Sequence, residues 1–241
     1  AYSMIGNCNA VVNRAELLTD GNEKDITTLV AEARCLRAFY YSILVNTYGN
    51  VTLTLEESSQ DPILTPQRNS IEELYTQIID DLKFAANNLE DTPYDNNRAR
   101  VTKKTALGLL ARVYAQGGGE YGLTEEGVSY WQRAKEVAED MILAYSDCLY
   151  DDVEDVWAPA NNRNNKEALF IAAGPDATNL ENWNAGTQCN NNFTYMYPKP
   201  NTLTIYPTPD NQNYWYGRTN NNTLAPSKYL LDCFDADYDK R

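Results

Sequence analysis

Apolar side chains recur at steps of three and four residues along the first 150 residues, which is the spacing of one face of an α-helix. The pattern is most regular between residues 29 and 48. The buried stripe expected there consists of Leu29, Ala33, Leu36, Tyr40, Ile43, Leu44 and Tyr48. We expect this helix to end at Gly49, because glycine readily takes the conformation that closes a last turn. Residues 51–55 alternate with a period of two, which predicts a short strand or an extended run.

A shorter helix is predicted before this one. The same spacing, from Tyr2 onward, indicates a helix that runs to about Leu18. The run Asp20-Gly21-Asn22 then breaks the pattern, since these residues favour turns. Asp25 or Thr28 is expected to cap the helix that carries the stripe over residues 29–48.

Two later helices begin with a capping box, in which a Ser and the residue three positions on satisfy each other's free backbone donors. Ser70 and Glu73 form the first box and open a helix with a stripe over residues 71–89. Ser129 opens the second helix, whose stripe spans residues 131–145.

A further helix lies between these two. Thr102 is expected to cap it, its apolar side spans residues 106–114, and the glycines at 117–119 are expected to end it. Paired antiparallel helices with small contact residues are typical of tetratricopeptide (TPR) units. We therefore predict a mainly α fold, a TPR-like helical-repeat scaffold of the α-α superhelix type. Its stripes bury against one another, with Leu110 in the core.

The character of the chain changes after residue 150, where the helical periodicity disappears. Residues 166–171 read as a short strand, and residues 174–225 are dense in Asn, Thr, Tyr, Trp and Pro, which predicts ordered loops. We expect residues 1–150 to form the helical scaffold and residues 151–241 to be a long, irregular, loop-rich portion of the same domain.

Composition excludes several classes of function. The formal net charge of −14 repels phosphate backbones, so nucleic acid is not an expected partner. The chain has no histidine, which excludes His-based catalytic triads and imidazole metal sites. Its five cysteines are far apart and odd in number, and we interpret most of them as buried apolar residues. No cofactor is expected.

The helix over residues 29–48 also carries a resemblance to a known family. Glu32-Ala33-Arg34, Leu36-Arg37-Ala38, Tyr41 and the turn at residues 48–51 resemble the signature of the SusD/RagB family of Bacteroidetes surface lipoproteins. The resemblance continues, in the same order, at residues 68–89, 102–114, 131–134, 166–171 and 226–241. Thr52 departs from it, because the family usually has Pro after this turn. The resemblance implies a SusD-like fold.

The chain begins within a helical pattern, so we expect it to be a fragment. Measured against the resembled family, it lacks the N-terminal lipid-anchoring cysteine and the C-terminal half. Its truncated end, residues 235–239, has the alternating carboxylates of a calcium loop but not the glycine that the loop requires. The acidic run at 151–155 is not expected to be catalytic, because neighbours in a loop rarely face each other across a substrate. We predict no metal site and no enzyme activity.

Aromatic residues in the polar loops are the candidate ligand contacts. A sugar ring offers a flat apolar face and a rim of hydroxyls, so its site needs an aromatic plate beside amide or carboxylate groups. The predicted aromatic plate and its hydroxyl partners are Trp183, Asn184, Gln188, Asn213, Tyr214, Trp215 and Tyr216. The alternative is that these rings attach the loops to the scaffold.

The resemblance implies capture of an oligosaccharide at the extracellular face of the outer membrane and its delivery to a SusC-like TonB-dependent transporter. It also implies that contact with the membrane is made only through a lipid anchor that this chain lacks. Three alternatives stay open at this point: a peptide-binding RagB-like uptake protein, a helical-repeat scaffold that binds only proteins, and a helical glycosidase.

Overall fold

The structure is a computed structural model of the 241-residue chain, and it describes residues 1–15, 17–57, 65–161 and 165–171. Of these, Ala1–Asp151 and Ala158–Ile171 belong to one compact unit, and Asp152–Trp157 belong to a second. The second unit contributes the short helix α6 (Val153–Trp157), in a stretch where no helix was expected. The predicted division of the chain at residue 150 stays a prediction.

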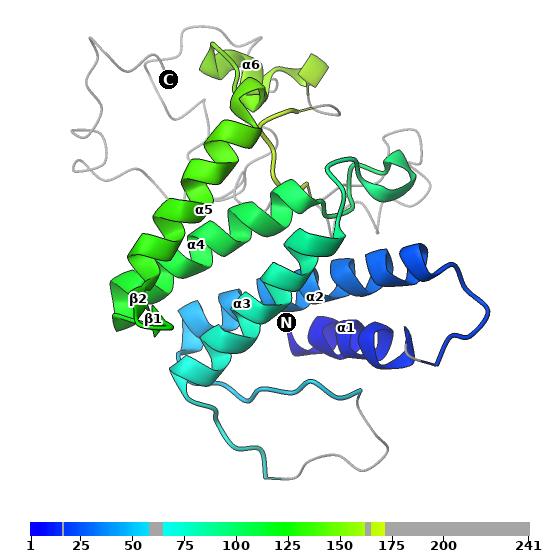
Figure 1. The fold of residues 1–241 in the computed structure, drawn as a ribbon, viewed down its shortest axis with the longest axis vertical. Helices are drawn as coiled ribbons and strands as arrows, with labels where there is room; N and C mark the ends of the chain where they lie inside the picture. The colour runs from blue at the N-terminus through cyan, green and yellow to red at the C-terminus, as the bar shows by residue number, and fades with distance from the viewer. Residues whose placement is uncertain (16, 58–64, 162–164, 172–241) are drawn as a thin grey trace, which may run out of the picture. The chain divides into compact units, whose positions relative to one another are not determined.

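Five α-helices make up most of the described part of the first unit (Figure 1). They are α1 (Tyr2–Ala15), α2 (Glu23–Tyr48), α3 (Ile71–Asn88), α4 (Lys103–Tyr121) and α5 (Tyr130–Ala144). An antiparallel pair, β1 (Thr124–Glu125) and β2 (Val128–Ser129), connects α4 to α5, with Thr124 opposite Ser129. The short 3₁₀ turns are η1 (Tyr94–Asn96), η2 (Ser146–Cys148) and η3 (Pro159–Asn161). Each of the five helices packs against the next along the chain, which is the predicted mainly α, TPR-like arrangement.

The helix starts follow the predicted caps closely. At the start of α3, the Ser70 amide donates to Glu73 Oε2 at 2.9 Å, and the Glu73 amide donates to Ser70 Oγ at 3.2 Å. Thr102 caps α4 as predicted. The second capping box is half formed: Ser129 Oγ accepts from the Gln132 amide, but the Gln132 side chain bonds to Glu136 instead.

The buried face of α2 agrees with the prediction only in part, since Ala33 and Leu44 of the predicted stripe are buried. Its core side is formed by Ala31, Cys35, Ala38, Tyr41, Leu44 and Val45. Leu29, Ile43 and Tyr48 of the predicted stripe are exposed, and Tyr48 is 70% exposed. The reason is that α2 packs against both α1 and α3, and small residues allow the close approach of two neighbouring helices. Asn22, rather than Asp25 or Thr28, caps this helix, and Gly49 ends it as predicted, with φ of +69°.

The prediction that residues 117–119 end α4 is wrong. The helix continues through Tyr121 and ends at Gly122 in the left-handed conformation. Gly117 is buried inside the helix, where a Cβ atom would lie 2.8 Å from the Tyr75 ring and 2.9 Å from the Tyr130 ring. This glycine is therefore needed for the close approach of two aromatic rings and not for a turn.

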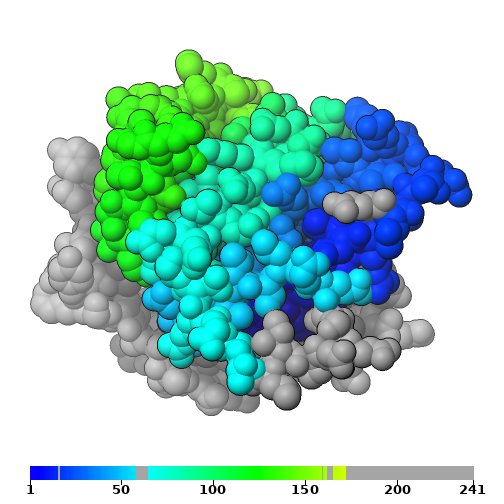
Figure 2. All heavy atoms as spheres, turned by 60° about the horizontal axis from the view of Figure 1, so that its bottom comes forward, coloured from blue at the N-terminus to red at the C-terminus, as the bar shows by residue number. Residues whose placement is uncertain are grey.

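Residues 51–57 form an extended run and not a strand. They lie beside α1 on the face that Figure 2 shows. Asn9 Nδ2 donates to the carbonyl oxygens of Thr54 and Glu56 at 2.9 and 3.1 Å. The Tyr41 hydroxyl donates to the carbonyl of Thr54 at 3.0 Å and accepts from the Thr54 amide at 2.8 Å. α1 itself ends at Ala15, earlier than the predicted Leu18.

The pair α4 and α5 confirms one core prediction and corrects another. Leu110 is buried, with 4% of its surface exposed. On α5, Tyr130 and Ala134 are the buried residues, whereas Trp131, which opened the predicted stripe, is 58% exposed. Tyr130 takes its place in the core because its ring packs edge to face on Tyr114, with centroids 5.0 Å apart.

Candidate functional site

The charged residues of α2 form buried or partly buried ion pairs with neighbouring segments. Asp81 of α3 accepts hydrogen bonds from Arg34 Nε at 2.7 Å and from Arg37 Nε and Nη2 at 2.7 and 2.8 Å. Arg37 also donates to Asn9 Oδ1 of α1 at 2.9 Å. These hydrogen bonds occupy both carboxylate oxygens of Asp81, so this cluster is structural.

A second ion pair connects α2 to the segment before α4. Glu32 accepts two hydrogen bonds from the guanidinium of Arg100, whose carbon lies 4.8 Å from the centre of the Tyr94 ring. This contact fixes the connection between α3 and α4 against the side of α2. Arg100 is thereby fixed as part of the wall of a hollow at this end of the unit.

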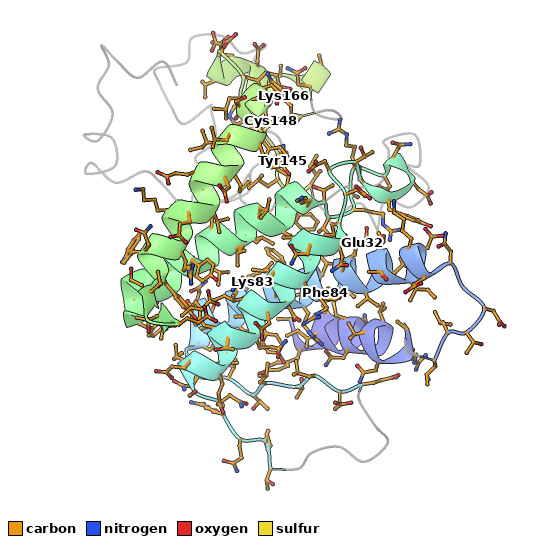
Figure 3. The ribbon with its side chains drawn as sticks, in the orientation of Figure 1. Glu32, Lys83, Phe84, Tyr145, Cys148 and Lys166 are labelled. Carbon is orange, nitrogen blue, oxygen red and sulfur yellow. The ribbon has the colours of Figure 1, made fainter. Side chains whose placement is uncertain are left out.

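A hollow of about 350 Å³ opens at this end of the first unit, and we call it the Phe170 hollow. Its walls come from three segments: residues 91–104 before and at the start of α4, residues 144–148 at the end of α5, and residues 168–171. Figure 3 shows Tyr145, Cys148 and Lys166 together at this end of the unit.

Residues 166–171 were predicted to be a strand, but no strand is assigned to them, and they lie along α4. The Thr105 hydroxyl donates to the Leu169 carbonyl, and the Tyr150 amide donates to Glu167 Oε1 at 2.6 Å. Gly108 lets the segment approach, because a Cβ atom there would lie 2.5 Å from Leu169 Cδ1. This segment is therefore held by side-chain contacts with α4 and not by pairing with another strand.

Phe170 supplies the aromatic surface of the hollow. Its side chain is 38% exposed, and its ring meets Phe39 of α2 edge to face, with centroids 5.7 Å apart. Such a contact fixes the orientation of an aromatic ring. Sequence reasoning missed Phe170 as a site residue because its segment had been interpreted only as a strand.

The polar groups of the hollow carry both signs of charge. The Tyr145 hydroxyl donates to Asp91 Oδ1 at 2.5 Å, and Lys104 Nζ donates to the Lys166 carbonyl at 2.5 Å. Burial, together with the hydrogen bond to Asp91, raises the pKa of Tyr145 above that of an ordinary tyrosine, so its hydroxyl stays a hydrogen-bond donor even in alkaline solution. Arg98 is exposed and makes no ion pair within the described residues.

The residues of the predicted aromatic plate, Trp183 to Tyr216, lie outside the described residues, as do Cys189, Cys233 and the calcium-like run at 235–239. Cys8 and Cys35 are buried free thiols, as expected. Asp152 Oδ1 accepts from the Glu154 amide at 3.1 Å, which gives this carboxylate a local role at the start of α6.

Over residues 1–171, less the gaps named above, no group of three metal-ligating side chains gathers. None of the helices in that part of the chain has the length and apolarity needed to cross a membrane.

Comparison with known proteins places the fold in a family. Residues 1–115 match a SusD-like family model described as starch-binding and associating with the outer membrane. A SusD-like protein of Bacteroides ovatus is 32% identical over 174 residues, which are 70% of this chain and 31% of that protein. The chain therefore belongs to the SusD-like family.

The solved structures that are similar to this chain include the following two. A crystal structure with a xylogluco-oligosaccharide has 30% identity and a TM-score of 0.59, and the match covers 72% of this chain and 34% of that one. A laminarin-binding SusD-like protein has 26% identity and a TM-score of 0.65, with 81% and 41% covered. The chain thus spans about a third of the length of the first of these and of the Bacteroides ovatus relative.

Proposed function

We propose that this protein captures an oligosaccharide at the extracellular face of the outer membrane, to which the full-length protein is lipid-anchored. The observation that carries the proposal is the 30% identity to a structure that holds a xylogluco-oligosaccharide. The family description, which names starch binding and the outer membrane, supports the same ligand class and location. In this proposal the captured sugar then passes to a SusC-like TonB-dependent transporter.

Capture is proposed to occur without turnover. Glycoside hydrolysis usually needs a pair of carboxylates that face each other across the sugar. Asp81 and Glu32 are held by arginines, Asp91 is hydrogen-bonded to a tyrosine, and Asp152 caps a backbone amide. Each of these four carboxylates is thus engaged in a structural contact.

The proposal is tested by screening the purified protein on a glycan array and on affinity gels that contain xyloglucan or laminarin. Retarded migration in at least one gel, with the sugar recovered intact, is the expected result. A peptide array run in parallel tests the other ligand class. Binding to peptides but to no glycan would overturn the proposal, and so would release of reducing ends that is lost in Asp152→Asn or Glu154→Gln.

The transporter step has its own test. The full-length protein, expressed in its native membrane with an affinity tag, is expected to co-purify with a TonB-dependent transporter after mild solubilisation. Recovery of the tagged protein without any such transporter would contradict the delivery step while leaving glycan capture intact.

A further inference from the structure

We propose that the Phe170 hollow binds one sugar ring of the captured oligosaccharide, as a contact separate from the predicted aromatic plate. This inference rests on the proposed function, because it assumes a glycan ligand. It differs from that function in placing a contact on the helical unit, in residues that the sequence did not single out for binding.

The size and the apolar wall of the hollow fit a sugar ring. Its volume of about 350 Å³ lies within the range of small-molecule sites, roughly 300–1,000 Å³. Phe170 lines the hollow and is partly exposed, and its edge-to-face contact with Phe39 holds its ring in one orientation. The apolar C–H face of a pyranose can pack on such a surface.

The charges on the walls favour a neutral polyhydroxyl ligand over an anion. Arg98 and Lys104 contribute two positive groups, and Asp91 and Asp147 contribute two negative groups. Arg100 also lines the hollow, but its charge is balanced by Glu32. A phosphate-binding site would contain only positively charged side chains. Sugar hydroxyls both donate and accept hydrogen bonds, so they can bind to carboxylates and to cationic groups at the same site.

Most of these groups are already held in position. Tyr145 is hydrogen-bonded to Asp91, and the Lys104 ammonium group is hydrogen-bonded to the Lys166 carbonyl, which leaves two of its three donors for a ligand. Arg100 is fixed between Glu32 and Tyr94. Binding to groups that are already ordered costs less conformational entropy than binding to free side chains.

The first experiment measures affinity by calorimetry in the full chain, with xyloglucan oligosaccharides and laminarin oligosaccharides as separate probes. Phe170→Leu keeps an apolar side chain and removes the flat ring, and Arg98→Gln removes a charge without a partner in the described residues. Each is expected to weaken binding of the recognised probe by roughly five- to tenfold. The melting temperature is expected to stay unchanged in Arg98→Gln and to fall slightly in Phe170→Leu, which loses the ring contact with Phe39.

Matched controls lie on the same unit but outside the hollow. Tyr48→Leu removes an exposed ring from the end of α2, and Arg112→Gln removes an exposed guanidinium from α4. Both are expected to bind like the parent protein. Trp215→Leu, tested beside them, reports on the predicted aromatic plate independently of the hollow.

The second experiment uses Cys148, a half-buried free thiol on the wall of the hollow. Alkylation with iodoacetamide is followed peptide by peptide by mass spectrometry, so that Cys148 is read separately from the other cysteines. Saturating oligosaccharide is expected to slow the labelling of Cys148 at least threefold, and free glucose at the same sugar concentration is expected to leave it unchanged.

The outcomes separate this inference from the proposed function. Unchanged affinity in Phe170→Leu and Arg98→Gln, with Cys148 labelled equally fast with and without ligand, overturns the hollow as a sugar contact while the protein remains a glycan-binding protein. If the parent protein binds neither these oligosaccharides nor any glycan on the array, the proposed function fails and the inference falls with it.

Discussion

Arg37 of α2 and Asp81 of α3 meet through two parallel hydrogen bonds, Nε to Oδ2 at 2.7 Å and Nη2 to Oδ1 at 2.8 Å. Both side chains are almost fully buried, at 4% and 1% exposure. A buried ion pair of this kind roughly repays the cost of removing its charges from water, but only while both partners are present. The pair therefore specifies how α2 and α3 align more than it adds net stability.

Asp81→Asn is expected to lower the free energy of unfolding by about 3–5 kcal/mol, because it leaves the buried Arg37 and the partly buried Arg34 without their counter-charge. Urea unfolding followed by circular dichroism measures the change. The neighbouring Asp80 is exposed, so Asp80→Asn is the control and is expected to stay within about 0.5 kcal/mol of the parent. A loss below about 1 kcal/mol in Asp81→Asn would contradict a structural role for the pair.

Gly117→Ala is expected to destabilise the protein, although alanine favours a helix over glycine by about 1 kcal/mol. The new Cβ would lie 2.8 Å from the Tyr75 ring and 2.9 Å from the Tyr130 ring, and overpacking of a buried site costs typically 1–3 kcal/mol. Thermal unfolding measures the difference. Gly119→Ala is the control: it is exposed, and its nearest neighbour is the end of the exposed Trp131 side chain at 3.2 Å, so it is expected to be neutral or slightly stabilising.

The sequence predicted most helix boundaries because these depend on local chemistry. Ser70 with Glu73, Thr102 and Gly49 are caps whose action is confined to one helical turn, and all three behave as expected. The end of α4 was predicted wrongly at Gly117, because glycine occurs both in turns and where two elements pack closely. Only the position of the rings of Tyr75 and Tyr130 distinguishes the two, and that position is a tertiary property.

The Phe170 hollow could not be predicted from the sequence, because it too depends on tertiary packing. Its walls bring together Arg98, Tyr145 and Phe170, which are far apart in the chain and join only after α4 and α5 have paired. The signature residues Arg34 and Arg37 were recognised by their spacing, but the spacing does not show that Asp81 is their shared partner. Pairings of this kind follow from the packing of whole helices.

Alkaline pH is expected to destabilise the fold through the buried tyrosines. Burial raises the pKa of Tyr75 and that of Tyr130 to about 12 in the folded protein, against about 10 in an unfolded chain. The folded state then binds more protons than the unfolded state between these values, so stability falls as the pH rises from about 10 to 12. Guanidinium unfolding at pH 8, 10 and 11 measures the fall.

Tyr130→Phe is the matched variant for this effect, since no hydrogen bond of the Tyr130 hydroxyl is found within the described residues. It removes one titrating group, so its stability should fall less steeply with pH than that of the parent. Parallel pH profiles for the two proteins would show that Tyr130 ionises alike in the folded and unfolded states.

The predicted aromatic plate at Trp183, Tyr214, Trp215 and Tyr216 is tested by Trp183→Ala and Trp215→Ala, made separately in the full-length protein. An exposed plate exchanges water for sugar at a small net gain, so the parent is expected to bind with micromolar to millimolar affinity, about −8 to −4 kcal/mol. A few aromatic anchors usually dominate a binding site, so loss of a main stacking ring should remove most of that binding energy. Calorimetry and thermal unfolding on the same samples separate the two roles of these rings. Lost binding with an unchanged melting temperature supports a plate, whereas a lower melting temperature with binding retained shows that the rings attach the loops to the scaffold.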